Sequence, residues 1–426
     1  MIKEIKYPEK INWNELIKRP AIENILLEKT VRKILDKVKA KGNKALKKFT
    51  KDLDGVKLKK ISVTEKEIAA AEKLITEDLK KAIQQAKSNI EKFHSAQKEE
   101  IKEIEIMPGI ICRRRSVAIE KVGIYIPGGS APLFSTVLML AIPAQLAGCK
   151  EIVLCTPPLK DGSIHPAVLY AAKRCGVSKV FKAGGAQAIG AMAYGTESIP
   201  KVFKIFGPGN QFVTCAKQLV QNENVAIDMP AGPSELLIIA DDTAVPEFVA
   251  ADLLSQAEHG PDSQVVLVTV SETLAEKVQL AIAEQIDNLP RKEIADQALN
   301  NSKIILLETL EEAIEFSNLY APEHLILACE NADALSPQIV AAGSVFIGNY
   351  SPESAGDYAS GTNHTLPTNG YAAMYSGVSV DSFVKKITYQ KLSKAGLQQI
   401  GRTVELMAEA EGLKAHANAV SIRLKN

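Results

Sequence analysis

The stretch KVFKIFGPGNQFVTCAKQLVQ, residues 201–221, predicts a strand, a glycine-rich turn and a helix in direct succession. Apolar residues dominate 201–206, which indicates a strand, and the spacing of apolar residues over 211–221 is typical of a helix. Two similar units precede this one, with strands expected at 150–155 and 179–182. A strand-to-strand spacing of about 25 residues is typical of βαβ units, so the sequence predicts a parallel sheet with crossover helices.

The same alternation begins again further along the chain, which predicts a second α/β unit. Strands are expected at 235–240, 264–270, 303–307, 324–329 and 344–347, and helices at 246–256, 272–286 and 309–320. Residues 1 to about 105 are expected to be mainly helical, with a capping box formed by Thr64 and Glu67. The chain is expected to return to helix from about residue 382.

The composition is that of a globular protein without a strong charge bias. Lys and Arg total 51, Asp and Glu total 50, and the net charge is +1, so neither nucleic acid nor a membrane surface is expected as a partner. The N-terminus is too charged for a signal peptide, and the longest apolar stretch, about 137–147, is shorter than a membrane span. The six scattered cysteines contain no Cys-x-x-Cys pair, which favours reduced thiols and a cytoplasmic location.

Three glycine-rich turns follow predicted strands of the first α/β unit, at 125–129, 183–187 and 206–210. Glycine at the carboxyl end of a strand lets the backbone approach a ligand, and the N-terminus of the following helix favours a phosphate. None of the turns is a Gly-x-Gly-x-x-Gly fingerprint, and no Walker lysine follows them. Each turn alone is consistent with an ordinary connection, whereas three on one sheet edge are equally consistent with a nucleotide or dinucleotide crevice.

Histidine is scarce, with six residues in 426, and the last four occur in short segments that also contain carboxylates or amides. These segments contain Gln256 and His259, Glu323 and His324, Asp357 and His364, and Glu411 and His416. Each has an ordinary explanation as a helix C-terminus, a strand start, an Asx turn or a helix face. Imidazole is also the commonest metal ligand and titrates near neutral pH. Their coincidence in one chain predicts a site assembled from distant segments.

Several longer motifs carry a resemblance to a known family. They are GIYIPGG (123–129), GGAQAI (184–189), GPGN (207–210), DMPAGPSE (228–235), DLLSQAEHG (252–260), APEHL (321–325), GDYASGTNHTLPT (356–368) and AEGLKAHANAV (410–420). On these motifs the chain resembles the histidinol dehydrogenase family. The resemblance covers nearly the whole chain and is weakest over the first hundred residues, where no site residue is expected.

The resemblance implies the last step of histidine biosynthesis, in which L-histidinol is oxidised to L-histidine through a bound aldehyde. It implies one Zn²⁺ per subunit and two NAD⁺ consumed per turnover. It further implies a homodimer with exchanged tails, in which tail residues complete the site of the neighbouring subunit. The implied fold is α/β, with two successive incomplete Rossmann-like parallel-sheet domains.

The resemblance and the strand pattern together give an expected domain organisation. A helical N-terminal region is expected over residues 1–120, packing on the second α/β unit. The NAD-binding Rossmann-like domain is expected over 121–234, and the zinc- and substrate-binding domain over 235–381. A helical tail, exchanged in the dimer, is expected over 382–426.

Site residues follow from the resemblance, motif by motif. Four residues are implied to bind zinc: Gln256, His259, Asp357 and His416. His324 is implied to be the general base, and Glu323 is implied to activate water for the second oxidation. Substrate contacts are implied for Ser234, His364 and Glu411, as well as for His324 and the four zinc ligands. NAD contacts are implied for Tyr125, Gln187 and Asn210.

The residue types suit this chemistry on general grounds. Alcohol oxidation needs a base for the hydroxyl proton, which histidine supplies near pH 7, and a carboxylate can activate the water that adds to an aldehyde. Two other classes of protein share some of these features. One is a zinc hydrolase, which activates water without a nucleotide, and the other is a non-catalytic nucleotide-binding or structural protein with incidental histidines. The glycine-rich turns argue against the hydrolase, since it does not need them.

Overall fold

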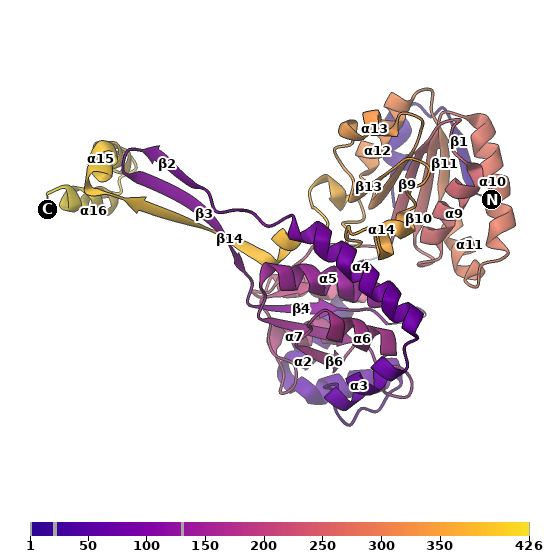
Figure 1. Cartoon of the computed structure of the whole chain (residues 1–426), viewed down its shortest axis with the longest axis horizontal. Coiled ribbons are helices and arrows are strands. Elements are labelled where there is room, and N and C mark those ends of the chain that lie inside the picture. The colour runs from indigo at the N-terminus through magenta and orange to yellow at the C-terminus, as the bar shows by residue number, and fades with distance from the viewer. Residues whose placement is uncertain (1, 20–23, 129–131, 426) are drawn as a thin grey trace.

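The computed structural model describes residues 2–19, 24–128 and 132–425, and it contains two parallel sheets and a projecting arm (Figure 1). Sheet A has six strands in the order β1-β11-β10-β9-β12-β13, all parallel. Its strands are β1 (Lys3–Lys6), β9 (Glu235–Ala240), β10 (Gln264–Thr269), β11 (Lys303–Leu306), β12 (His324–Ala328) and β13 (Ser344–Ile347).

Helices cover both faces of sheet A. Along β9, Leu236 and Ile238 face a core shared with α9 (Pro246–Ala257), α10 (Glu272–Ile286) and α11 (Lys292–Asn300). The alternate residues Leu237 and Ile239 face a second core with α12 (Leu310–Tyr320) and with Trp13 of α1 (Trp13–Leu16). A parallel strand buried on both faces needs apolar residues at nearly every position, which explains the run ELLIIA of β9.

Sheet B has five parallel strands in the order β6-β5-β4-β7-β8. They are β4 (Lys121–Tyr125), β5 (Glu151–Thr156), β6 (Lys179–Lys182), β7 (Lys204–Phe206) and β8 (Ala226–Ile227). Helices α5 (Phe134–Ala147) and α6 (Pro166–Arg174) cover one face, and α7 (Gly185–Tyr194) and α8 (Gln211–Gln221) the other. The predicted α/β class with two successive parallel sheets is therefore confirmed. Among the described residues, no helix is both long enough and apolar enough to cross a membrane.

The N-terminal region differs from the expectation that residues 1–120 pack on the second α/β unit. Residues 2–19 do so, through β1 and α1, and Asn89 donates a hydrogen bond to the carbonyl of Ala359. The helices α2 (Asn24–Phe49), α3 (Glu65–Lys73) and α4 (Glu77–Ser95) instead pack on the helices of sheet B. The apolar stripe of α2, with Val31, Leu35 and Val38, lies against the small residues of α7, and a methyl group on Gly190 would already touch Leu35. The capping box of Thr64 and Glu67 begins α3 as predicted.

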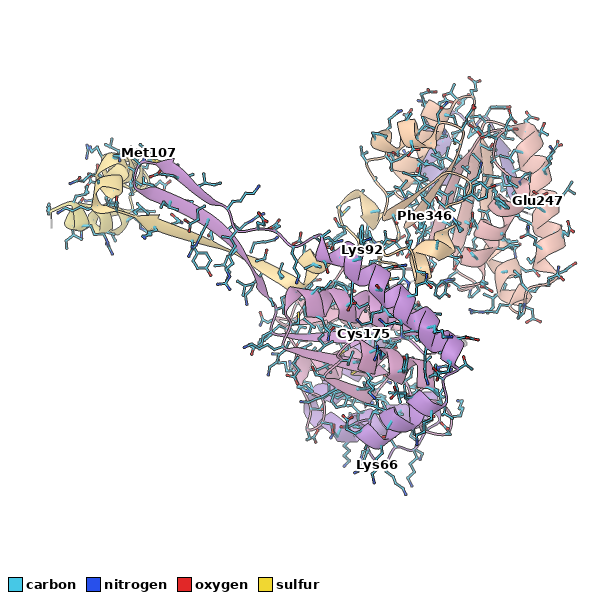
Figure 2. The ribbon with its side chains drawn as sticks, in the orientation of Figure 1. Lys66, Lys92, Met107, Cys175, Glu247 and Phe346 are labelled. Carbon is cyan, nitrogen blue, oxygen red and sulfur yellow. The ribbon has the colours of Figure 1, made fainter. Side chains whose placement is uncertain are left out.

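The arm is the second difference from expectation. It is an antiparallel sheet of three strands in the order β14-β3-β2. The strands are β2 (Glu103–Met107), β3 (Ile110–Ala118) and β14 (Val384–Leu392), which lie in the N-terminal region and the tail, both of which were expected to be helical. Helices α15 (Lys394–Ala410) and α16 (Lys414–Lys425) follow β14 and pack on each other at its far end (Figure 1). Figure 2 shows Met107 at this distal end and Phe346 in the lobe of sheet A.

The missing signal in these strands is a buried face. The side chains of β2 are exposed throughout although its sequence, EIEIM, alternates over five residues, and those of β14 are exposed or half-buried without a regular alternation. Their pairing joins residues 110–118 to residues 384–392, which no local pattern records.

The base of the arm is anchored on sheet B by aromatic packing. Phe383, at the end of the short helix η5 (Val380–Phe383), is fully buried and stacks on Phe206 of β7, with ring centroids 4.0 Å apart. The same turn provides the carbonyl of Ser382, which accepts a hydrogen bond of 2.8 Å from Lys204. The direction in which the arm leaves the body is therefore set at β7, next to the 206–210 turn.

Replacing Phe383 with alanine should lower the free energy of unfolding by about 3–5 kcal/mol, because a fully buried ring is removed and the backbone of the arm base cannot close the cavity. Urea unfolding followed by circular dichroism measures this. Phe203→Ala, at a position 54% exposed beside the same strand, is the matched control and should cost less than about 1 kcal/mol. Equal losses in the two variants would contradict an anchoring role for Phe383.

Candidate functional site

His324 and Glu323 lie at the amino end of β12, where both side chains are buried and held by the first residue of the neighbouring strand β9. The backbone N–H of Glu235 donates to Glu323 Oε2 at 2.9 Å. His324 Nδ1 lies 3.1 Å from the carbonyl oxygen of Glu235. Since a carbonyl only accepts, Nδ1 carries the proton of the neutral ring, and Nε2 is left as its acceptor.

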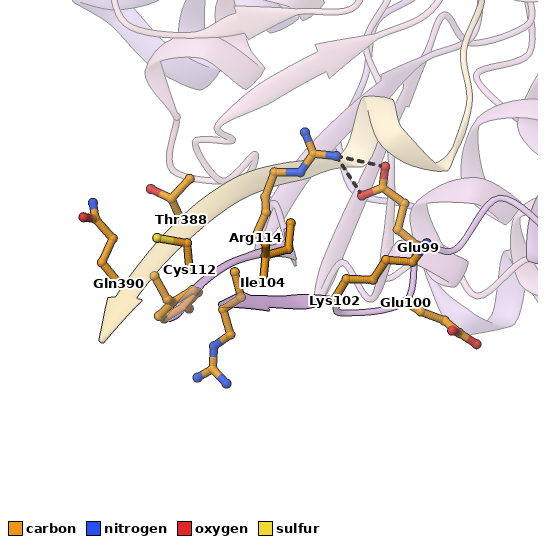
Figure 3. Close-up of a pocket in the computed structure, with 10 residues that line it drawn as sticks. Glu99, Glu100, Lys102, Ile104, Cys112, Arg114, Thr388 and Gln390 are labelled. Carbon is orange, nitrogen blue, oxygen red and sulfur yellow. Dashed lines mark hydrogen bonds and ion pairs between the residues drawn. The ribbon is translucent and has the colours of Figure 1, made fainter. Parts of the chain in front are cut away.

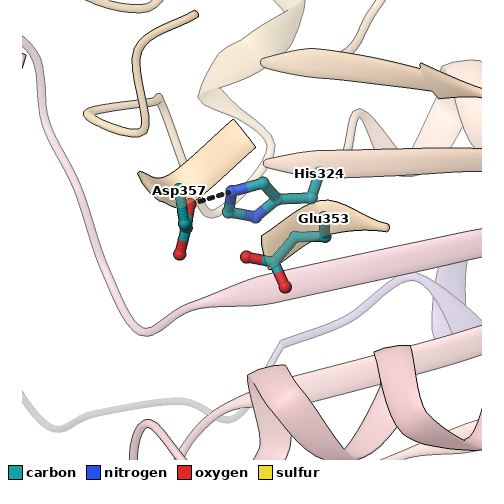
Figure 4. A group of neighbouring side chains, drawn as sticks. All are labelled: His324, Glu353 and Asp357. Carbon is teal, nitrogen blue, oxygen red and sulfur yellow. Dashed lines mark ion pairs between the residues drawn. The ribbon is translucent and has the colours of Figure 1, made fainter. Parts of the chain in front are cut away.

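The free nitrogen of His324 faces two carboxylates of the short helix α14 (Glu353–Tyr358), as Figure 4 shows. His324 Nε2 is 3.7 Å from Asp357 Oδ1, and it has no hydrogen-bond partner among the described residues. Glu353 is four residues before Asp357, on the same side of the helix, and is itself buried. Ligand atoms of His324, Glu353 and Asp357 all lie within 4.8 Å of one another, so these three side chains could share a metal ion.

The pKa values in this cluster are set by burial and by the mutual attraction of its charges. Burial raises the pKa of Glu323 to about 8 and that of Glu353 to about 8. Burial would lower the pKa of His324, but the charges of Glu323 and Asp357 outweigh it and raise that pKa to about 10. Burial would raise the pKa of Asp357, but His324 and His364 outweigh it and hold that pKa well below its usual range. The pKa of His324 is raised and that of Asp357 is lowered, as expected for two groups whose opposite charges attract.

Helix α9 brings Gln256 and His259 to the same edge of sheet A. The strands are parallel, so a helix that leaves the carboxyl end of β9 returns to the amino edge, where β12 begins. Gln256 is fully buried, yet neither atom of its amide has a partner among the described residues. Burial lowers the pKa of His259, and the charges of Asp357, His324 and His364 also act on it, so its ring lies near the cluster. His259 Nδ1 is 3.4 Å from Ser234 Oγ, just before β9.

His364 connects this cluster with sheet B. Its Nδ1 lies 2.9 Å from the carbonyl oxygen of Asp357, and its Nε2 lies 3.0 Å from Thr136 Oγ1 on α5. The adjacent Asn363 donates to the carbonyl of Met139, also on α5, at 2.6 Å. The loop after α14 is thereby fixed to the other α/β unit, and the side chain of His364 borders both.

The residues implied to contact NAD lie at the carboxyl edge of sheet B. Tyr125 ends β4, and its hydroxyl accepts a hydrogen bond of 3.0 Å from the backbone N–H of Gly185; burial raises the pKa of Tyr125 to about 12. Gln187 is buried in α7, with its side-chain oxygen unpartnered among the described residues. Asn210 caps α8, accepting from Phe212 and Val213. Tyr125 and Asn210 organise the turns through these bonds, and the N-terminus of α8 beside them is exposed.

The glycine-rich turns pack closely against one another. Gly207 has φ +127°, and a Cβ there would lie 2.1 Å from the carbonyl oxygen of Tyr125. A Cβ on Gly184 would lie 2.5 Å from Pro157. Gly129 of the first turn lies outside the described residues. Close packing of backbone accounts for these glycines without a ligand, so they permit a nucleotide site but do not prove one.

Glu411 and His416 do not join the cluster of their own chain. Both are exposed, at the junction of α15 and α16. Figure 1 shows these helices at the tip of the arm, away from sheet A. The structure therefore gathers Ser234, Gln256, His259, Glu323, His324, Asp357 and His364 at one edge of sheet A, and it leaves the two tail residues free to meet another molecule.

Three polar residues of this edge were missed by sequence reasoning. Glu353 has a detectable signal, since it precedes Asp357 by four residues at the start of a helix. Glu235 is a carboxylate at the head of an otherwise apolar strand, which is a second signal. Ser255 donates to Glu353 Oε2 at 2.9 Å and so joins α9 to α14, but nothing in its sequence context indicates this bond.

A hollow of about 710 Å³ lies on the arm rather than at the cluster (Figure 3). It is lined by residues of β2, β3 and β14 and of the segment before β2, including Glu99, Ile104, Arg114 and Thr388. Glu99 and Arg114 pair across it at 3.3 Å. We do not take it as the active site, because none of the described histidines lines it and it lies on the arm, apart from the cluster at sheet A.

Comparisons with known proteins agree on one family. The family model described as histidinol dehydrogenase matches residues 17–424. A histidinol dehydrogenase of Bacteroides thetaiotaomicron is 60% identical over 424 residues, which cover 100% of this chain and 99% of the relative. That of Escherichia coli is 52% identical, covering 97% of each chain. The crystal structure of histidinol dehydrogenase from Elizabethkingia anophelis superposes with a TM-score of 0.98 at 58% identity, covering 100% of this chain and 98% of the other.

His259→Ala and Asp357→Ala should each abolish tight binding of zinc, because each removes one of few nitrogen and oxygen donors around the unpartnered amide of Gln256. Metal content after dialysis, measured by atomic emission, should fall from about one zinc per chain to near zero. Asp262→Ala, which removes an exposed carboxylate three residues after His259, is the control and should keep its zinc. Full zinc content in His259→Ala would refute this assignment of ligands.

Proposed function

The chain belongs to the histidinol dehydrogenase family, and from this premise we propose that it oxidises L-histidinol to L-histidine in two steps, each passing a hydride to NAD⁺. The observation that carries the proposal is the pair Glu323 and His324, buried side by side and fixed by the two backbone groups of Glu235. Membership of an oxidoreductase family of histidine biosynthesis decides against the hydrolase and the non-catalytic alternatives.

In the proposed mechanism His324 is the general base. Its Nδ1–H donates to the carbonyl oxygen of Glu235, so Nε2 is the nitrogen that accepts the hydroxyl proton of histidinol. The hydride leaves the carbon that bears this hydroxyl. Return of that proton to solvent restores the neutral ring before the second step. The fixed ring orientation matters because a base must lie within hydrogen-bond distance of the proton that it removes.

Glu323 is proposed to act in the second step. The aldehyde must add water before a second hydride can leave, and a carboxylate can take a proton from that water. Burial raises the pKa of Glu323 to about 8, which makes its carboxylate a stronger base than an exposed one. One oxygen is occupied by the N–H of Glu235, and the other is left for water.

Zinc fits the donors gathered at this edge. Gln256 has a buried amide without a partner among the described residues, and His259 and Asp357 add an imidazole and an ionised carboxylate. We propose these three residues, together with His416 of the partner subunit, as its ligands. When bound, zinc would hold the nitrogen donors of histidinol and, as a nearby cation, would favour the neutral form of His324. Ser234, His364 and Glu411 are proposed to contact the substrate.

NAD⁺ is proposed to bind at the carboxyl edge of sheet B, in the domain of residues 121–234, and it supplies the hydride acceptor. The N-terminus of α8 is exposed after the 206–210 turn, and its positive end would favour a phosphate, while the N–H groups of Phe212 and Val213 are capped by Asn210. Residues 235–381 are then the zinc- and substrate-binding domain. His364, which touches α5 of the first domain through Thr136, lies where substrate and nicotinamide would meet.

The arm supports a homodimer with exchanged tails, again as a proposal. Glu411 and His416 are polar, exposed and remote from their own sheet A, and the three zinc ligands proposed from one chain leave a fourth position for such a residue. A second copy arranged by a two-fold axis can supply both residues, since such an axis makes each tail reach the other subunit equally. In this arrangement residues 382–426 complete the neighbouring site.

Two NADH should form for each histidinol consumed, with histidine as the product. In Glu323→Gln the oxidation of supplied histidinaldehyde should slow about 10²–10⁴-fold, the range for loss of a positioned acid–base group, and more than the alcohol step. Stopped-flow absorbance of NADH with each substrate measures both. Equal slowing of the two steps would contradict a role confined to water.

Mixing two inactive variants tests the exchanged tail. His416→Ala and His259→Ala chains are unfolded and refolded together, so that about half of the dimers are mixed. If the tail is exchanged, one site of each mixed dimer is intact, and about a quarter of wild-type activity should return. If each tail serves its own chain, every site keeps a lesion and no activity returns, even when native mass spectrometry shows mixed dimers.

A further inference from the structure

Arg19, in the N-terminal segment, is almost enclosed and grips the first residue of β9. Its side chain is 14% exposed, and that of Glu235 is 2% exposed. Arg19 Nε donates to Glu235 Oε1 at 2.9 Å, and Nη2 donates to Oε2 at 3.0 Å. The pair is therefore bidentate, a geometry that fixes the carboxylate in orientation as well as in position.

The same guanidinium also holds the end of α12. Arg19 Nη2 donates to the carbonyl oxygen of Tyr320 at 2.6 Å, and the guanidinium carbon lies 3.7 Å from the centre of the Tyr320 ring. Tyr320 is the last residue of α12, and Ala321 turns the chain with φ +50° toward Glu323. One side chain thus bridges the start of β9 and the connection that leads into β12.

These two segments carry the hydrogen bonds of the proposed acid–base pair. The backbone N–H of Glu235 holds Glu323, and its carbonyl oxygen holds His324. The carboxylate of Glu235 also accepts from the backbone N–H of Asn369 at 2.8 Å. Rotation of the Glu235 peptide would move both catalytic side chains, and its own side chain, clamped by Arg19, opposes that rotation.

We propose that Arg19 is a positioning residue, which acts through Glu235 and the Tyr320 carbonyl to set the orientation of Glu323 and His324. The inference rests on the function proposed for those two residues. The ladder of β9 with β12 begins only at Leu236 and His324, whereas on the β10 side Gln264 pairs with Glu235 and donates to the carbonyl of Ser234. Arg19 therefore adds support to Glu235 on the side where the β12 ladder has not yet begun. Lysine cannot replace arginine in this role, because an ammonium has no planar fork to engage both carboxylate oxygens and a carbonyl together.

The test compares Arg19→Lys with wild type and with Lys10→Met. Lys10 ties the same N-terminal segment to Glu315 of α12 and lies over Trp13, but it has no contact with β9, so its loss controls for weaker docking of the segment. In folded Arg19→Lys we expect kcat for each half-reaction to fall about 10–100-fold, the scale of a misplaced catalytic group. KM for NAD⁺ should stay within about 2-fold, since the proposed cofactor site lies on sheet B. KM for histidinol should change less than kcat, since Ser234 and His324 are the only proposed substrate contacts beside the segments that Arg19 holds.

Hydrogen–deuterium exchange gives a readout that does not depend on turnover. The amide of Glu235 should exchange faster in Arg19→Lys than in wild type, and it should be unchanged in Lys10→Met. If Arg19→Lys does not fold, Glu235→Gln replaces it, because its amide oxygen still accepts from Asn369 while the ion pair is lost.

The possible outcomes separate this inference from the proposed function. If kcat in the folded variant stays within about 2-fold of wild type, the positioning role is overturned, whatever the exchange shows. A fall in kcat accompanied by an equal fall in Lys10→Met also overturns it, because docking of the segment then explains the loss. If wild-type protein forms no NADH from histidinol, the proposed function fails, and faster exchange at Glu235 in Arg19→Lys alone would still support the contact.

Discussion

The peptide of Glu235 is the constraint on which the site depends. Its N–H and C=O point to Glu323 and His324, which are adjacent in sequence and would otherwise project to opposite faces of β12. Because Glu323 precedes β12 and His324 is its first residue, both side chains can turn toward Glu235, the first residue of β9. Fixing Nδ1 of His324 leaves Nε2 directed at Asp357, and the whole arrangement of base, carboxylates and proposed metal donors follows from that orientation.

The cluster and the proposed cofactor site lie at different edges of the two sheets. The cluster lies at the amino ends of the strands of sheet A, where α9 and α14 return, whereas the glycine-rich turns lie at the carboxyl ends of sheet B. In open α/β sheets ligands usually bind at the carboxyl edge, and only the proposed cofactor site obeys that rule. The hydrogen bonds of His364 to Thr136 and of Asn363 to Met139 fix the position of one edge relative to the other.

Much of this architecture could be predicted from sequence, because buried parallel strands leave a strong local signal. The strand expected at 235–240 is the strand observed, and that expected at 150–155 differs from β5 by one residue at each end. Of the four histidine-containing segments that the sequence indicated, three meet at one edge of sheet A, and the fourth lies in the tail. Long-range contacts leave no such local signal. β14 pairs with β3, a strand from the first third of the chain, and α2 packs on sheet B because α7 presents small residues to it. In the sequence Arg19 cannot be told from an ordinary surface charge, because its contacts with Glu235 and Tyr320 depend on the fold.

The structure offers two possible sets of metal ligands. His324, Glu353 and Asp357 are close enough to share an ion, whereas we propose that His324 transfers protons and that Gln256, His259, Asp357 and a tail histidine bind zinc. Anomalous diffraction at the zinc absorption edge from zinc-loaded crystals separates the two directly. We predict one peak per chain, bounded by Gln256, His259, Asp357 and His416 of the partner subunit, with His324 Nε2 not coordinated. A peak enclosed by His324, Glu353 and Asp357, or by residues of one chain alone, would contradict this prediction.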